Sequence, residues 1–107
     1  METQDVKKIP RFRKKPITVE AVKIAQETLP LLLGWGEGFI ETDYTLDYFN
    51  HNKIRVTIKT TTGEHTAIEG DWVVKGINGQ FYAMPNETFW ELYEPEDKET
   101  EEYVIRW

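Results

Sequence analysis

The chain has 107 residues, of which 39% are hydrophobic and 30% charged, and its 13 Lys and Arg against 19 Asp and Glu give a net charge of −6. This length and balance indicate one globular domain with a modest core, and they exclude a disordered chain. Ser and Cys are both absent, which excludes a Ser or Cys nucleophile and a zinc site built on thiolates.

The first elements expected along the chain are a strand and a short helix. Apolar residues occupy every second position over 17–21, which is the period of a half-buried strand, and Pro16 is tolerated at a strand start. After Ala21 the apolar residues change from one set of alternate positions to the other, so we expect a bulge or the end of the strand there. A short helix is expected over 26–33, with Pro30 in its first turn, where a missing N–H costs nothing.

The middle of the chain predicts a loop and several short strands. Residues 34–38 contain three glycines and are expected to form a loop, followed by a short strand over 39–42. Alternation over 54–59 predicts a strand with one face in water. A turn at 62–63 then leads into a returning strand over 65–68.

A second hairpin and a helix are expected next. Strands over 72–75 and 80–84 flank the Asn-Gly dipeptide at 78–79, which is typical of a hairpin turn. A helix follows over 86–93, with Asn86 as its N-cap. Together these elements predict an α+β fold with a small, strongly curved, mostly antiparallel sheet or partial barrel and two short helices.

Charge divides the chain unevenly. Residues 1–23 hold seven Lys or Arg and three Asp or Glu, whereas the remaining residues hold six and sixteen. The boundaries that we predict are a basic N-terminal arm at 1–10, a single α+β domain at 11–93, an acidic linker at 94–102 and a C-terminal tail strand at 103–107. Because no apolar run is long enough to cross a membrane and the first residues lack the apolar core of a secretion signal, we expect an intracellular protein.

Two long motifs resemble those of a family of small proteins encoded by bacteriophages and prophages. Residues 13–21, R-K-K-P-I-T-V-E-A, match that family's opening strand, R-K-K-P-x-x-V-E-A. Residues 70–82, G-D-W-V-V-K-G-I-N-G-Q-F-Y, resemble its hairpin, G-D-W/Y-I-I-K-G-x-x-G-E-F-Y, with Val73 and Val74 at the two Ile positions and Gln80 where Glu is usual. The likeness covers both ends of roughly residues 11–94 and does not include the middle, residues 26–53. The acidic linker and tail are an addition to it. The resemblance implies a phage origin and a host bacterial cytoplasm, and the family as a whole has no established activity.

Basic and aromatic side chains are candidates for a site that binds a small phosphate-bearing ligand. Such a pocket needs one or two cations and an aromatic wall, whatever the net charge of the protein. Trp35 is expected to be exposed, because glycines flank it in the predicted loop. One alternative is that the acidic C-terminal part only balances the charge of the basic arm. Another is that the candidate residues on strands only make cross-strand packing contacts. The candidate ligand-binding residues are Arg13, Lys15, Trp35, Trp72, Lys75 and Tyr82.

The C-terminal part of the chain offers candidates for a protein contact. Phe89, Leu92 and Tyr93 make the core-facing stripe of the predicted helix, which leaves Trp90 at its edge or outside. The predicted tail strand could pair with a sheet edge of its own chain or of a partner, and self-pairing would give a homo-oligomer. The candidate partner-binding residues are Trp90, Tyr103, Ile105 and Trp107.

Catalytic and metal-binding patterns are not recognisable in the sequence. His51 and His65 have no ligand spacing with the carboxylates at 41, 43 and 47, so we expect no metal site and no cofactor. Asp71 follows a glycine at a strand start, where it fits a turn-forming role better than a catalytic one. The net negative charge disfavours binding to duplex nucleic acid, and the short apolar runs disfavour a membrane partner.

These observations predict a non-enzymatic, phage-encoded binding protein without catalytic residues. Its surplus of aromatic side chains and its basic arm favour a counter-defence protein that sequesters a small nucleotide-derived host signal. An alternative is a phage inhibitor that binds a host protein through the acidic linker and the C-terminal tail. A third alternative is an enzyme that uses carboxylates or a bound metal.

Overall fold

The computed structural model describes residues 9–13, 16–43, 54–104 and 107. The elements in chain order are β1 (Glu20–Lys23), α1 (Leu29–Trp35), β2 (Ile40–Asp43), β3 (Arg55–Thr60), β4 (Gly63–Ile68), β5 (Trp72–Lys75), β6 (Phe81–Met84), α2 (Asn86–Leu92) and α3 (Lys98–Val104). The described residues form two antiparallel three-stranded sheets, ordered β1-β5-β6 and β2-β3-β4, and three helices. The α+β class is therefore confirmed, with two separate sheets that do not close into a barrel. Within these residues no helix has both the length and the apolar character to cross a membrane.

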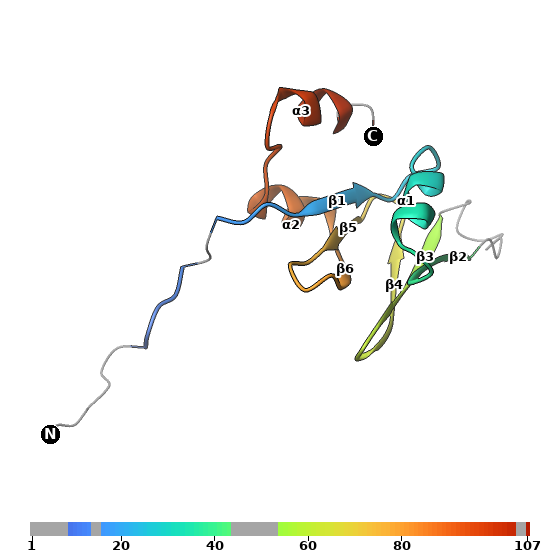
Figure 1. Ribbon diagram of the computed structural model, residues 1–107, viewed down its shortest axis with the longest axis horizontal. Coiled ribbons are helices and arrows are strands. Elements are labelled where there is room, and N and C mark those ends of the chain that lie inside the picture. Colours follow the sequence, from blue (N-terminus) through green and yellow to red (C-terminus); the bar gives the residue numbers. More distant parts are fainter. Residues whose placement is uncertain (1–8, 14–15, 44–53, 105–106) are drawn as a thin grey trace, which may run out of the picture.

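The sheet β1-β5-β6 is buried on both of its faces. Val22 and Val73 are opposite each other in the register and belong to a first core cluster, shared with α1 and the sheet β2-β3-β4. Ala21 and Val74, the neighbouring opposite pair, belong to a second core cluster, to which α2 and α3 contribute. Figure 1 shows α2 at the left of this sheet, α3 above it, and α1 with β2, β3 and β4 at its right. Burial on both faces explains why these strands are apolar at consecutive positions.

β1 continues without a bulge past Ala21, which corrects the expectation of a bulge or a strand end there. The change in the alternation of apolar residues instead reflects a strand that contacts a core cluster on each of its faces. The strand begins at Glu20, later than the alternation predicts, because its partner β5 ends at Lys75, opposite Glu20. Residues 17–19 lie beyond the end of that partner, and Ile17 is 41% exposed.

α1 begins later than expected, at Leu29, and Pro30 lies in its first turn as predicted. In the turn before the helix, the buried Thr28 hydroxyl donates a hydrogen bond to the carbonyl of Lys23. The same hydroxyl accepts a hydrogen bond of 3.0 Å from the N–H of Ala25. One side chain thereby satisfies two backbone groups at the point where β1 leads into the helix.

The predicted loop over 34–38 is shorter than expected, because Gly34 and Trp35 belong to α1. The chain turns at 36–38 and enters β2 directly. A Cβ atom at Gly36 would lie 2.8 Å from side-chain atoms of Ile40, so only glycine allows this close approach of the turn to β2.

Both predicted hairpins are confirmed, together with the strands that they join. In β3-β4, Thr60 is paired with Gly63, whose φ of 126° is one that residues with a side chain rarely adopt. In β5-β6, Lys75 is paired with Phe81, so the Asn-Gly dipeptide lies inside a loop that is longer than two residues. Asn78 Oδ1 accepts a hydrogen bond of 3.1 Å from the backbone N–H two residues further on, which stabilises this loop.

The C-terminal segment corrects the prediction of an acidic linker over 94–102 and a tail strand over 103–107, because residues 98–104 form a helix. Tyr103 and Val104 are helical, as part of α3, so they cannot pair with a sheet edge. Asp97 Oδ1 accepts a hydrogen bond of 2.8 Å from the N–H of Thr100, and its hydrogen bonds with Thr100 lower the pKa of Asp97. Acidic side chains in the first turn also suit the helix dipole, which explains why an acidic run starts a helix. Trp107 packs against both core clusters.

Substitution of Thr28 by valine tests the connection between β1 and α1. Valine keeps the burial but leaves the Lys23 carbonyl and the Ala25 N–H without this partner, so we expect the free energy of unfolding to fall by about 1–3 kcal/mol. Urea unfolding followed by circular dichroism measures the change. Thr66→Val, at an exposed position of β4, is the control and is expected to change stability by less than about 0.5 kcal/mol. Equal stability of Thr28→Val and the wild type would contradict the role assigned to the hydroxyl.

Candidate functional site

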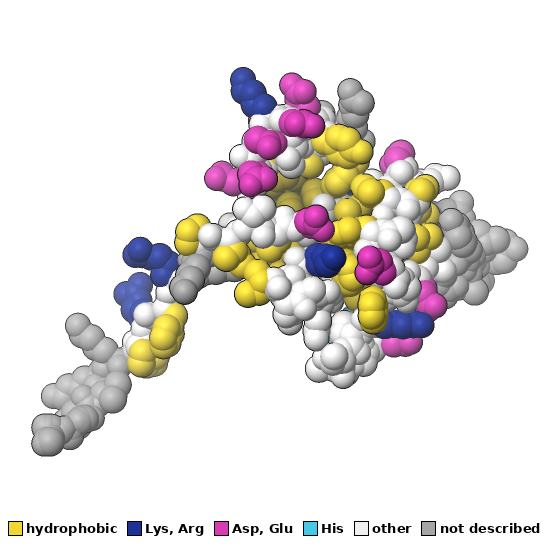
Figure 2. All heavy atoms as spheres, viewed as in Figure 1, with side chains coloured by type: hydrophobic (Ala, Val, Ile, Leu, Met, Phe, Trp, Pro, Cys, Tyr) yellow, Lys and Arg dark blue, Asp and Glu magenta, His cyan; other side chains and the backbone are white. Residues whose placement is uncertain are grey.

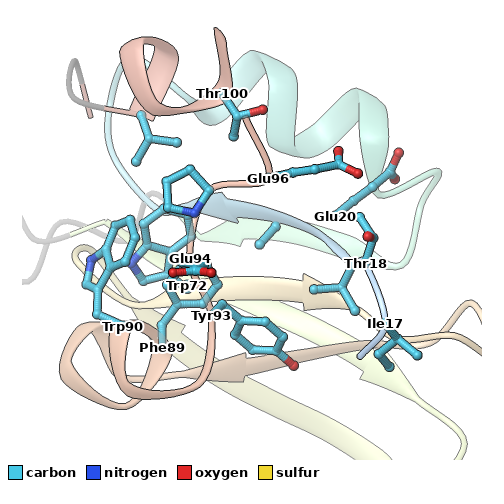
Figure 3. A pocket seen from close by; sticks show the side chains of 14 residues that line it. Ile17, Thr18, Glu20, Trp72, Phe89, Trp90, Tyr93, Glu94, Glu96 and Thr100 are labelled. Atoms are coloured by element: carbon cyan, nitrogen blue, oxygen red, sulfur yellow. The ribbon is translucent and has the colours of Figure 1, made fainter. Parts of the chain in front are cut away.

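A cleft of about 560 Å³ lies between β1, α2 and α3 (Figure 3). One wall is the extended chain of residues 17–21, which includes the start of β1. Thr100 and Val104 line it from α3. The side chains that line the rest of the cleft come from β5, α2 and the residues after α2: Trp72, Phe89, Trp90, Tyr93, Glu94, Pro95 and Glu96.

Aromatic rings form the floor of this cleft. Trp72 of β5 is only 2% exposed and stacks on Phe89 of α2, with ring centroids 3.9 Å apart and planes 2° from parallel. Trp90 packs edge-on against Trp72 with a centroid distance of 5.5 Å, and it stays 41% exposed. Trp107 contacts the same Trp72 ring at 5.6 Å. Stacked and edge-on contacts stabilise such a cluster beyond the area that it buries, so the floor is a fixed apolar surface.

One side-chain amide holds two of these indoles. Asn86 Oδ1 accepts a hydrogen bond of 2.9 Å from Nε1 of Trp72 and one of 3.2 Å from Nε1 of Trp90. Asn86 is the first residue of α2, and Pro85 occupies the N-cap position without a side-chain cap. The predicted N-cap role of Asn86 is therefore wrong. Its amide serves the indoles instead, because the N–H of a buried tryptophan needs an acceptor.

The hydroxyl groups of Tyr82 and Tyr93 lie 3.1 Å apart and share a hydrogen bond, which connects β6 to the residue that follows α2. Burial, together with the hydrogen bond and the charge of Tyr93, raises the pKa of Tyr82 to about 12. Tyr82 is therefore a neutral hydrogen-bonding group at neutral pH. Since Tyr93 lines the cleft, this bond helps to fix one of the cleft walls.

The charged groups of the cleft are all acidic. Glu20, Glu94 and Glu96 line it, and there is no Lys or Arg among the described residues that do so. In Figure 3, Glu94 lies in front of Trp72, and Glu96 points toward Glu20. Glu20 Oε1 also accepts a hydrogen bond of 2.8 Å from Nε1 of Trp35. Carboxylates beside aromatic rings attract a cation through both charge and ring quadrupole, whereas they repel a phosphate.

Two of the candidate ligand-binding residues, Trp35 and Lys75, contact a residue of the first core cluster instead of the cleft. Trp35 meets the ring of Phe81 edge-on at a centroid distance of 4.9 Å, and Lys75 Nζ lies 5.7 Å from the centroid of the same ring. Trp35 is half-buried at the end of α1, so the prediction of an exposed Trp35 in a loop is wrong. Its packing on Phe81 and its bond to Glu20 account for the burial.

The other candidate ligand-binding residues are spread over the molecule. Trp72 lies in the cleft floor, and Tyr82, which is 39% exposed, is bonded to Tyr93. Arg13 is exposed in the N-terminal segment, while Lys15 lies outside the described residues. The described members of this set therefore do not gather around one pocket.

The candidate partner-binding residues lie closer together. Trp90 lines the cleft, and Tyr103 of α3 is 61% exposed. Trp107 meets Tyr103 edge-on at 5.9 Å and packs against the core, while Ile105 lies outside the described residues. The structure thus brings together Trp72 and Trp90, which the sequence analysis assigns to two different sites.

The sequence analysis misses the acidic rim of the cleft. Glu94 and Glu96 fall in the predicted linker, and Tyr93 falls in the predicted core stripe. The available signal is local: a Glu-Pro-Glu run directly after a helix that carries an exposed Trp90 places acids near that ring. Their position opposite residues 17–21 depends on where α3 packs against the rest of the chain, which the local sequence does not specify.

A metal centre is not formed by the described part of the chain, in which no group of three or more His, Asp or Glu side chains is placed to hold an ion. His51 and Asp47, which the sequence analysis considers as ligands, lie outside the described residues. Asp71 Oδ2 accepts a hydrogen bond of 3.1 Å from the N–H of Ile68, in agreement with its predicted role in a turn.

No family model, no curated protein and no solved structure matches the chain. The resemblance to phage proteins stays a prediction drawn from residues 13–21 and 70–82. A function therefore has to be argued from the chemistry of the cleft.

Replacing Asn86 with alanine removes the shared acceptor of the two indoles. Because Trp72 then keeps a buried N–H without this partner, we expect the free energy of unfolding to fall by about 1–3 kcal/mol. The emission of Trp90 is expected to shift as its ring loses an anchor. Asn86→Asp keeps an acceptor oxygen and is expected to retain most of the stability. Urea unfolding followed by tryptophan fluorescence measures both effects, and an unchanged alanine variant would contradict the role of this amide.

The tyrosine pair predicts a loss of stability at alkaline pH. The unfolded chain ionises Tyr82 near pH 10, whereas the folded chain keeps the proton up to about pH 12. The contribution of this group is therefore complete below pH 10 and is lost progressively as the pH rises toward 12. Tyr93→Phe should lower the pKa of Tyr82, because burial is then the only remaining cause of the rise. Absorbance titration of tyrosinate, with Tyr103→Phe as the control, measures it; identical Tyr82 titrations in Tyr93→Phe and the wild type would refute the coupling.

Proposed function

We propose that the protein is a non-enzymatic binding protein that holds a basic segment of a partner protein in its acidic, aromatic cleft. The observation that supports this most is the composition of the cleft, whose lining combines aromatic rings with the acidic residues Glu20, Glu94 and Glu96 and has no Lys or Arg among its described residues. An arginine side chain suits it best, since a planar guanidinium can stack on Trp90 and pair with Glu94 at the same time. Lysine would form the ion pair with weaker stacking.

The outer face of α3 extends this acidic surface. Glu99, Glu101 and Glu102 are exposed, and Figure 2 shows acidic side chains gathered around α3. Lys98 is the one basic residue of α3, so this surface is predominantly acidic. A predominantly acidic surface accelerates the encounter with a basic partner and orients it. The cleft would then supply the specific contact, while α3 steers the partner toward it.

The alternative of a sequestered nucleotide-derived signal has less support in the geometry. A phosphate needs at least one cation at the site, and Lys75 lies on Phe81 whereas Arg13 lies in the N-terminal segment. The carboxylates at 20, 94 and 96 would repel it. The resemblance of residues 13–21 and 70–82 to phage proteins makes a bacterial host protein the partner that we propose.

Point substitutions test this function better than removal of the C-terminal segment. Trp107 packs against both core clusters, so deletion of residues 94–107 would expose apolar surface and confuse loss of binding with loss of fold. Glu94 and Glu96 are exposed, and their replacement leaves the core intact.

We therefore expect Glu94→Gln/Glu96→Gln to weaken binding of a short synthetic peptide of arginine, lysine and glycine by about tenfold, since each rim charge contributes about 0.2–1 kcal/mol. Titration followed by tryptophan fluorescence measures the affinity, which should also fall as salt is raised. Glu27→Gln/Glu64→Gln, with the same change in charge away from the cleft, is the matched control and should bind like the wild type.

Two further probes separate the hypotheses. A peptide with glutamate in place of its basic residues should not bind, and neither should ATP. Binding of ATP, or equal affinity of the rim variant and the control variant for the basic peptide, would overturn the proposed function.

A further inference from the structure

Residues 9–13, which overlap the end of the predicted basic arm at 1–10, are called the arm from here on. Their large apolar side chains are not covered by the rest of the described chain. Phe12 is 94% exposed and Ile9 is 86% exposed. Arg11 and Arg13, on either side of Phe12, are exposed as well. Figure 1 shows this arm leading away from the folded body. An arginine-phenylalanine-arginine segment in full contact with water is available for a contact with another surface.

The chemistry of the arm complements that of the cleft. The cleft offers a half-exposed Trp90 and the carboxylates of Glu94 and Glu96, all of which can be reached from solvent. Phe12 can pack against the indole, and the flanking guanidinium groups can pair with the carboxylates. Figure 2 shows the basic side chains of the arm well separated from the acidic side chains around α3, so this charge complementarity is not satisfied within the described chain.

The geometry disfavours insertion of the arm into the cleft of its own chain. The arm leads into residues 17–19, which already form one wall of that cleft. A return into the same cleft needs a tight reversal just before the wall. Only residues 14–16 separate the arm from that wall in the sequence, which leaves little chain for such a reversal.

We propose that the arm of one copy occupies the cleft of a second copy, so that the protein forms a dimer by reciprocal exchange of arms. Because each arm emerges beside its own cleft, a two-fold axis between the copies places each arm against the cleft of the other, and both contacts form at once. This inference rests on the proposed function in one respect, the preference of the cleft for a basic, apolar segment. It adds that a basic partner must displace the arm, so that dimerisation and partner binding compete.

The experiment reverses the charge of the arm and the charge of the cleft rim in two separate variants. The full chain is compared with Arg11→Glu/Arg13→Glu, which has an acidic arm, and with Glu94→Lys/Glu96→Lys, which has a basic rim. Sedimentation velocity over a wide range of concentration at low salt gives the oligomeric state of each, after circular dichroism has shown that each is folded. Arg11→Lys/Arg13→Lys, which preserves the charge of the arm, is the matched control.

We expect the wild type and the lysine control to dimerise and each reversed variant to dimerise at least tenfold more weakly. An equimolar mixture of the two reversed variants should form a heterodimer, because the acidic arm of one fits the basic rim of the other, and the basic arm fits the acidic rim. A wild type that stays monomeric, reversed variants that still dimerise alone, or a mixture that stays monomeric would overturn the inference.

The same variants keep this inference separate from the proposed function. Arg11→Glu/Arg13→Glu has an intact cleft, so its affinity for the basic peptide should equal or exceed that of the wild type. If this variant binds the peptide while the wild type shows no dimer, the exchange of arms fails and the proposed function stands. If the variant does not bind the peptide, the proposed function fails regardless of the oligomeric state.

Discussion

The structure depends on the need to bury both faces of the small sheet β1-β5-β6. Val73 and Val74 are adjacent residues of β5 with no exposed surface, and they belong to different core clusters. One face of the sheet packs against α1 and the sheet β2-β3-β4. The other face packs against a second layer, which consists of α2, α3 and the side chains around Trp72. The second layer is built from two helices of seven residues each. It is too small to close over the edge of β1, and the cleft is the part of this face that stays open.

Local signals were sufficient where a strand pairs with its neighbour in sequence. The two hairpins follow from alternating side chains and from turn residues such as Gly63, and both were predicted. The limits of β1 were not, because they depend on where the distant β5 ends. The helical state of α3 was also not predicted. The hydrogen bond that the Thr100 N–H donates to Asp97 outweighs the β propensity of the residues near Tyr103.

The candidate site shows a similar division. The sequence analysis named Trp72 and Trp90 as candidates, but their common site arises only when α2 lies over β5 and Asn86 reaches both indoles. Trp35 was misplaced because three nearby glycines suggested a loop, whereas packing against Phe81 extends the helix through it. The acids of the rim were assigned to a solvated linker, because solvated acidic runs and acids that border a cleft have the same composition.

The shared acceptor on α2 has a consequence for how the interior responds to events at the surface. An amide oxygen divides its electron density between its donors, so a displacement of the half-exposed Trp90 alters the bond that the same Asn86 oxygen makes with the buried Trp72. Trp72, which is only 2% exposed, would therefore respond to any occupant of the cleft that displaces Trp90. The NMR resonance of the Trp72 Nε1–H proton would report this change in the native chain, without an added label.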